Sequence, residues 1–97
     1  MYAIAIIRYR KPMEEVQKHL DVHRAYLHEL KKKGLLLASG PVVPRMGGAV
    51  LLRVPDNEVD ATLDSIREND PYVRSGIAQW EMWPWTPVIG TENLDRL

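Results

Sequence analysis

A chain of 97 residues has room for one hydrophobic core, because two separate cores would each be too small to offset the entropy lost on folding. Hydrophobic residues make up 45% of it and charged residues 27%, which excludes a disordered or membrane-embedded class. Lys plus Arg (13) equals Asp plus Glu (13) without a run of like charge, so neither a nucleic-acid nor a membrane partner is indicated. The absence of cysteine excludes a disulfide framework and a thiolate nucleophile, and it fits a cytoplasmic location.

The first two predicted elements are a strand and a long helix. Tyr2–Tyr9 is rich in β-branched and aromatic residues and ends before Lys11-Pro12, which is typical of a strand. From Met13 to Lys33, apolar positions alternate at intervals of four and three residues, which predicts a helix with one inner stripe. That stripe consists of Val16, Leu20, His23, Leu27 and Leu30. Gly34 supplies the C-terminal cap.

The second half of the chain predicts a hairpin, a helix and a last strand. Leu35–Val43 and Ala49–Val54 are apolar and joined by a short Pro- and Gly-containing link, so an antiparallel hairpin is the default. A second helix begins near Pro55 and ends at Asp70-Pro71, with an inner stripe of Val59, Leu63 and Ile66. Ile77–Trp85 is the fourth strand. We expect one domain over residues 1–97, in which residues 86–97 form a C-terminal tail.

This order of elements is that of the α+β, ferredoxin-like βαββαβ arrangement, a four-stranded antiparallel sheet with two helices on one face. The first strand is apolar on both sides, since one side carries Tyr2, Ile4 and Ile6 and the other Ala3, Ala5 and Ile7. A solvated face should instead alternate with polar residues. We therefore expect a homodimer through the open sheet face, a dimeric α/β barrel, with Trp80, Trp83 and Trp85 at or near the interface.

His23 occupies a stripe position where the helical pattern calls for leucine or valine. One interpretation is a core histidine whose ring nitrogens are satisfied by neighbouring groups. The other is a general acid or base, because an ordinary imidazole pKa of about 6.5 suits proton transfer at neutral pH. His19 lies one turn earlier on the same face and raises the alternative of a zinc site, but only Glu15 stands near them, so no metal is expected.

Asp70 follows the second predicted helix, where exposed carbonyl groups disfavour a carboxylate. As part of an Asp-Pro pair, it could serve only to end that helix. Alternatively, it could orient and charge a histidine on the neighbouring helix, as a carboxylate does when it fixes an imidazole tautomer. Both helices pack on the same sheet face, so a contact with His23 is geometrically reasonable.

Ser39, Gly40 and Pro41 interrupt the apolar second strand, either as a plain bulge or as a bend that opens a pocket over the sheet. In such a pocket a carboxylate or other anion could be bound by Arg8, Arg45 and Arg53. These arginines could equally be solvated surface charges. We do not expect Ser39 to be a nucleophile, since it lacks the Gly-x-Ser-x-Gly turn.

Three motifs, in order along the chain, resemble the YciI-like (YCII-related) family: His23 with Gly34, the segment Leu36–Pro41, and Asp70-Pro71-Tyr72-Val73 before Gly76. The resemblance runs from about Tyr2 to Pro84. It implies a dimeric α/β barrel and an active site built on a His-Asp pair, here His23 and Asp70. One related enzyme is a dehydrochlorinase of a hydroxylated chloroaromatic compound, and muconolactone isomerases share the broader barrel fold.

The leading hypothesis is a cofactor-independent lyase or isomerase for a small cyclic or aromatic metabolite, in which His23 moves the proton and Asp70 orients it. The expected substrate contacts are Ser39, Gly40, Pro41, Tyr72 and Arg8. The alternative is a non-catalytic, dimeric ligand-binding or accessory protein in which a buried His23–Asp70 hydrogen bond holds the helices together. Heme-dependent or oxygen-using chemistry, which similar barrels host, is a third interpretation that no motif contradicts.

Overall fold

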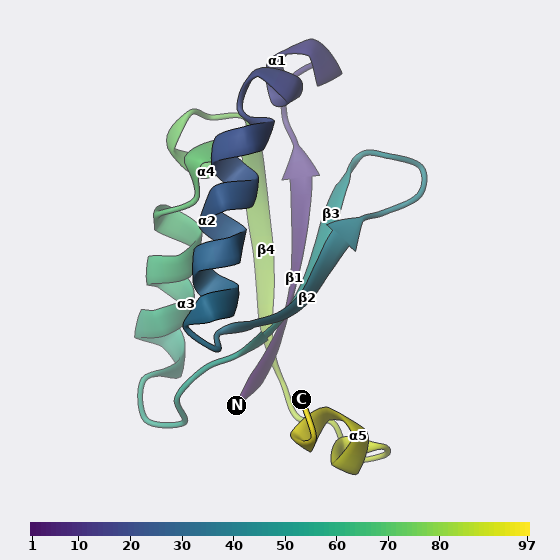
Figure 1. The fold of residues 1–97 in the computed structure, drawn as a ribbon, viewed down its shortest axis with the longest axis vertical. Helices are drawn as coiled ribbons and strands as arrows, with labels where there is room; N and C mark the ends of the chain where they lie inside the picture. The colour runs from purple at the N-terminus through teal and green to yellow at the C-terminus, as the bar shows by residue number, and fades with distance from the viewer.

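The computed structural model describes residues 1–97 and has two layers, a four-stranded antiparallel sheet and a layer of helices on one of its faces (Figure 1). The strands, in the sheet order β2-β3-β1-β4, are β2 (Leu36–Pro41), β3 (Gly47–Arg53), β1 (Tyr2–Tyr9) and β4 (Ala78–Trp85). The two longer helices on the covered face are α2 (Leu20–Lys32) and α3 (Val59–Glu68). The α+β, ferredoxin-like prediction is confirmed.

Three short helices complete the chain: α1 (Met13–Lys18), α4 (Pro71–Arg74) and α5 (Thr91–Asp95). The single helix predicted from Met13 to Lys33 is therefore wrong, because the chain breaks at His19 between α1 and α2. The last turn of α1 ends there, and the His19 ring nitrogen Nδ1 lies 3.2 Å from the carbonyl oxygen of Glu15. None of these helices has the length and the apolar run that crossing a bilayer requires.

The register of the central strand β1 decides which residues face the helices. Its partners across the sheet are Leu52 for Ala3, Val50 for Ala5 on β3, and Trp80 for Ile7 on β4. The small alanines let the helices approach, and the larger partners fill the space between them. The core built around this face comprises Ala3, Ala5, Ile7, Val16, Leu30, Leu36, Val50, Leu52, Val54, Leu63, Ile66, Tyr72, Ile77, Ala78 and Trp80.

The other sheet face, which we call the open face, carries no helix of the main layer (Figure 1). Its centre is apolar and half-buried or exposed, with Ile4, Ile6, Leu51 and Trp83. The prediction that Trp80 lies at or near this face is wrong: Trp80 is 3% exposed on the covered face, whereas Trp83 is 50% exposed. Alternation along β4 explains the difference, because Trp80 and Trp83 are three positions apart and point to opposite sides.

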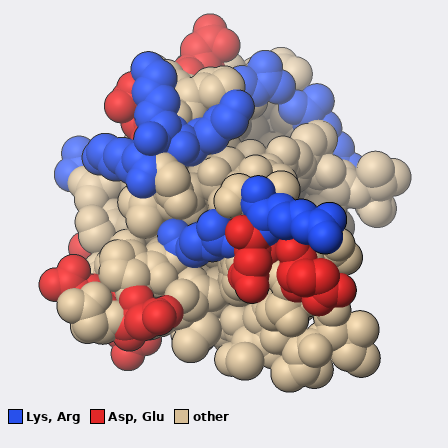
Figure 2. Space-filling view, turned by 60° about the horizontal axis from the view of Figure 1, so that its bottom comes forward, with Lys and Arg blue, Asp and Glu red and all other residues tan.

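The predicted C-terminal tail contains α5, which packs beside the start of β1. There the Tyr2 hydroxyl donates to Asp95 at 2.7 Å, and Arg53 donates to the carbonyl oxygen of Leu94 at 2.8 Å. Figure 2 shows a surface with both signs of charge, on which Lys and Arg side chains lie on both sides of a hollow in the upper half.

Candidate functional site

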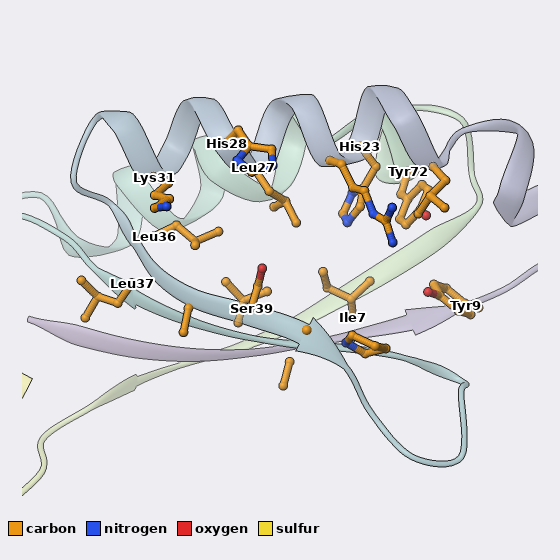
Figure 3. Close-up of a pocket in the computed structure, with 18 of the residues that line it drawn as sticks. Ile7, Tyr9, His23, Leu27, His28, Lys31, Leu36, Leu37, Ser39 and Tyr72 are labelled. Atoms are coloured by element: carbon orange, nitrogen blue, oxygen red, sulfur yellow. The ribbon is translucent and has the colours of Figure 1, made fainter. Parts of the chain in front are cut away.

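A cavity of about 430 Å³ lies between α2 and the β2-β3-β1 part of the sheet. Its floor includes Ile7 and Val50, and its wall on the α2 side includes Leu20, His23 and Leu27. In Figure 3 the α2 side chains point down toward the strands, and the Ser39 hydroxyl points up from β2 toward the helix. This volume lies within the range of small-molecule sites.

The predicted contact between His23 and Asp70 is confirmed. Nδ1 of His23 lies 2.7 Å from Oδ1 of Asp70, and the two residues are 7% and 0% exposed. A carboxylate can only accept, so Nδ1 donates, and the neutral ring carries its lone pair on Nε2. His23 lines the cavity, and its Nε2 has no hydrogen-bond partner within the protein. The arrangement therefore leaves one basic nitrogen directed to the cavity side of the helix.

The electrostatic environment of Asp70 differs from the one expected from the sequence. It is the N-cap of α4, not an unfavourable acid at the end of a helix, because Pro71 starts a new helical turn. Its Oδ1 accepts the backbone N–H of Tyr72 at 3.3 Å, where the helix dipole favours a negative charge. Its Oδ2 accepts the indole N–H of Trp80 at 2.7 Å. Three donors thus satisfy a fully buried carboxylate.

Tyr72 completes the group around the histidine. Its ring stacks on the His23 imidazole with centroids 3.8 Å apart and planes at 5°, and it meets Tyr9 edge-on at 6.0 Å. Tyr72 is 1% exposed, and its hydroxyl is the one enclosed side-chain polar atom that has no hydrogen-bond partner. Burial, helped by the neighbouring Tyr9 and Asp70, raises the Tyr72 pKa to about 12. The phenol is therefore a protonated donor at neutral pH.

The segment Ser39, Gly40 and Pro41 lies on the edge strand β2 and lines the cavity, as the pocket interpretation of that bend requires. The loop that follows β2 is held in place where Gly47 lies against β1. A Cβ on Gly47 would lie 1.7 Å from the carbonyl oxygen of Ile7, so glycine alone permits this approach. Nearby, the Tyr9 N–H donates to the carbonyl oxygen of Met46 at 3.0 Å. These contacts position the loop that carries Arg45.

The three arginines singled out as anion ligands lie in different places. Arg45 lines the cavity, but the structure does not bring Arg8 or Arg53 to it. Arg8 alternates with Ile7 along β1 and therefore points to the open face, where its Nε donates to Glu81 at 2.6 Å. Arg53 stands over the Tyr2 ring, 4.8 Å from its centroid.

Sequence reasoning missed three other cationic or titratable residues in the lining, Arg24, His28 and Lys31 of α2. Their signal was present, since they recur at intervals of four and three residues and form a second stripe beside the apolar one. The stripe could not be assigned to a cavity before the angle between α2 and β2 was known. Nowhere in residues 1–97 do three or more His, Asp or Glu side chains gather in a way that could hold a metal ion.

Comparison with known proteins identifies a family and a fold likeness to solved structures. The model of the YCII-related domain matches residues 1–86. The structure of 5-chloro-2-hydroxyhydroquinone dehydrochlorinase (TftG) from Burkholderia phenoliruptrix AC1100, in complex with 2,5-dihydroxybenzoquinone, is similar with a TM-score of 0.70. The alignment covers 91% of this chain and 96% of that one at 22% identity, which is a likeness of fold. No curated protein sequence gives a significant match. The match over residues 1–86 shows that this chain belongs to the YCII-related domain family.

Proposed function

We propose that this protein is a lyase or isomerase that acts on a small cyclic or aromatic metabolite, with His23 as the residue that moves the proton. The observation that carries the proposal is the pairing of His23 Nδ1 with the buried Asp70, which leaves Nε2 without a protein partner beside the cavity. A base oriented in this way by a carboxylate is suited to general acid–base chemistry. Asp70 would stabilise the imidazolium that forms when Nε2 takes a proton.

The chemistry follows from the residues that surround this base. His23 takes a proton from the substrate, and the electron pair of the broken bond moves into a new double bond. In an elimination the leaving group departs from the adjacent atom with its own electron pair, whereas in an isomerisation the imidazolium returns the proton at another position. The proposal requires no cofactor, because the proton acceptor and its stabilising charge are both side chains of this chain.

A flat, ring-shaped substrate is supported by the shape and the composition of the cavity. Aromatic rings and apolar floor residues surround His23, and ten of the nineteen lining residues are hydrophobic. Substrate contacts would come from Ser39, Gly40 and Pro41 on β2 and from Tyr72 on α4. Family membership and the fold likeness to TftG, a dehydrochlorinase of a hydroquinone, support the same substrate class.

The test is turnover of a panel of hydroxylated chloroaromatic compounds and unsaturated cyclic lactones by His23→Ala. We expect turnover to fall by about 100-fold or more, because general acid–base catalysis contributes that much. The matched control is His19→Ala, since His19 lies outside the cavity lining and should tolerate the change. Circular dichroism checks that both variants fold. Full turnover by a folded His23→Ala protein would end the proposal.

We also propose that a second copy of the chain covers the open face. The centre of that face is apolar and the Arg8–Glu81 ion pair lies at its side, an arrangement of apolar core and polar rim that is common in protein interfaces. An uncovered apolar sheet face would otherwise remain in water. A dimer formed through this face places the two cavities on the outer, helical sides of the sheets.

One observation favours a second candidate function, a non-catalytic ligand-binding protein. Asp70 is completely buried and connects α2, α4 and β4 through His23, Tyr72 and Trp80, which is also what a structural hydrogen-bond network would do. Nuclear magnetic resonance of the His23 ring separates the two functions. A ring that exchanges its proton with solvent and shifts when ligand binds supports catalysis. A ring that stays in one protonation state between about pH 5 and 8 supports the structural role.

A further inference from the structure

We infer that the cavity recognises a small monoanion whose negative charge lies on oxygen, held by Tyr72 as hydrogen-bond donor and by Arg24 and Arg45 as counter-charges. This rests on the proposed function, because it names the substrate class for the same cavity. Three independent observations carry it: the sign of the lining charges, their lack of partners, and a buried donor without an acceptor.

The lining has charge of one sign. Arg24, Lys31 and Arg45 line the cavity together with His28, and no Asp or Glu is among the lining residues. The chain as a whole has a formal net charge of +0, so this local excess does not follow from composition. Asp70, which pairs with the lining residue His23, is already satisfied by three donors.

These cations have no partners within the protein. Arg24, Lys31 and Arg45 take part in none of the salt bridges and in none of the side-chain hydrogen bonds. Of the ten other basic residues, four are paired with an acid, namely Arg8, Lys18, Lys32 and Arg67. Arg24, Lys31 and Arg45 are all exposed to solvent at the lining of the cavity. Unpaired guanidinium groups there are free to bind an oxyanion, since Arg binds carboxylate oxygens with paired N–H donors.

The Tyr72 hydroxyl locates where an oxygen of the ligand would lie. It is enclosed, has no partner, and belongs to the ring that stacks on His23. Figure 3 shows Tyr72 beside His23 on the helix side of the cavity, above Tyr9. A buried hydroxyl without a partner costs free energy. Its O–H can donate to an acceptor, and an anionic oxygen of a ligand in the cavity would supply one.

The same charges would act on the reaction. When His23 takes a proton, negative charge develops on the substrate, and the cations that line the cavity would stabilise that charge. Arg24 and Arg45 act to lower the pKa of Tyr72, against the larger effect of burial.

Direct binding of two probes of the same shape tests the inference without any turnover. The probes are benzoate, which is anionic, and benzamide, which is neutral, titrated by calorimetry and by chemical shifts of the His23 ring. We expect benzoate to bind at least about tenfold more tightly than benzamide at low salt, and the preference to shrink as ionic strength rises. Arg24→Gln and Arg45→Gln should each weaken benzoate about fivefold and leave benzamide unchanged. The control is Arg96→Gln, which removes the same charge outside the cavity lining and should change neither affinity.

Tyr72→Phe gives a readout that a structural role would not give. Removing a hydroxyl that has no partner should leave the melting temperature of the free protein equal or higher, while benzoate binds about three- to tenfold more weakly. A lower melting temperature with unchanged benzoate affinity would contradict the inference.

Equal affinity for benzoate and benzamide, or no binding of benzoate at millimolar concentration, would overturn the anion site. A double variant, Arg24→Gln with Arg45→Gln, that keeps the benzoate preference would do the same. The outcome for the enzyme is separate, since His23→Ala should retain the preference for benzoate. Loss of the preference with turnover intact ends only the anion inference. Retention of the preference with no turnover by the unaltered protein ends only the proposed function.

Discussion

The two faces of the sheet have similar hydrophobicity along β1 but differ in what covers them. Ala3, Ala5 and Ile7 are buried beneath the helices, whereas Ile4 and Ile6 are only half-buried on the open face. Alternation along one strand therefore supplies two apolar surfaces, and a single chain of this length covers one of them.

The polar groups on the two sides differ even more in how deeply they are buried. On the covered side, Asp70 is fully buried and accepts hydrogen bonds from His23 and Trp80. On the open side, the Arg8–Glu81 and Tyr2–Asp95 contacts are exposed. A pair in a low-dielectric interior is costly to break, whereas an exposed pair is screened by water and contributes little. The comparison teaches that the buried network both stabilises the fold and provides the candidate base.

The largest effect is expected when a buried aspartate is replaced by alanine. Asp70→Ala tests this on the covered side, and Asp95→Ala is the matched substitution on the open side. Asp70→Ala should lower the free energy of unfolding by about 3–5 kcal/mol, because it leaves buried donors without an acceptor. Asp95→Ala removes one exposed hydrogen bond and should cost less than about 1 kcal/mol. Urea denaturation of both variants measures the difference, and similar losses would remove the contrast between the two sides.

A second test changes the open face itself. Leu51→Asp places a charge at the apolar centre of that face, and Val22→Asp places one on the exposed side of α2 as a control. In sedimentation we expect two copies of the 11.1 kDa chain for the unaltered protein and for Val22→Asp, but a single copy for Leu51→Asp. An unaltered protein that already sediments as one 11.1 kDa chain would show that nothing covers the open face.

Alkaline pH should affect the covered side through two tyrosines. Burial raises the pKa of Tyr26 and of Tyr72 to about 12 each. An unfolded tyrosine ionises near about 10, so the folded state holds these protons more tightly. Their contribution to stability is complete below about pH 10 and is lost as the pH rises toward about 12. Phenolate absorbance should show late ionisation that Tyr26→Phe and Tyr72→Phe each reduce. Ionisation of both groups near pH 10 in the folded protein would contradict this prediction.

The smallest effect is expected for Arg8→Gln. Arg8 lies on the open face with Glu81, so the substitution should change benzoate affinity less than about twofold and the free energy of unfolding by less than about 1 kcal/mol. Calorimetry and urea denaturation give the two values. A fivefold loss of benzoate affinity would contradict this prediction and indicate that Arg8 takes part in ligand binding.

Two errors of the sequence analysis share one cause. Arg8 was expected near the pocket and Trp80 near the open face, and both have the opposite placement. The parity of each residue within its strand could be read from the sequence, because side chains alternate along a strand. Ile7 and Trp80, which are partners across the sheet, both lie on the covered side. What could not be read is which parity faces the helices, because β1 is apolar on both sides.

The sequence analysis predicted only part of the site, because some of its contacts depend on how distant elements pack. His23 was found because an imidazole breaks a regular apolar stripe, and its contact with Asp70 was expected once both helices were placed on one face. The role of Asp70 as the N-cap of α4 was missed, since a four-residue helix is too short to have a periodic pattern. Trp80 was missed as a partner because its indole reaches Asp70 only through the packing of β4 beside α4.

The sequence by itself determined the order and type of the main elements and the two residues of the candidate dyad. Periodicity and turn residues act over a few neighbouring positions, so they can be read locally. The tertiary structure alone decided which sheet face is covered. It also decided that Arg24 and Arg45 line one cavity and that the Tyr72 hydroxyl is buried without a partner. These features depend on strand register and helix packing between segments far apart in the chain, which no local pattern encodes.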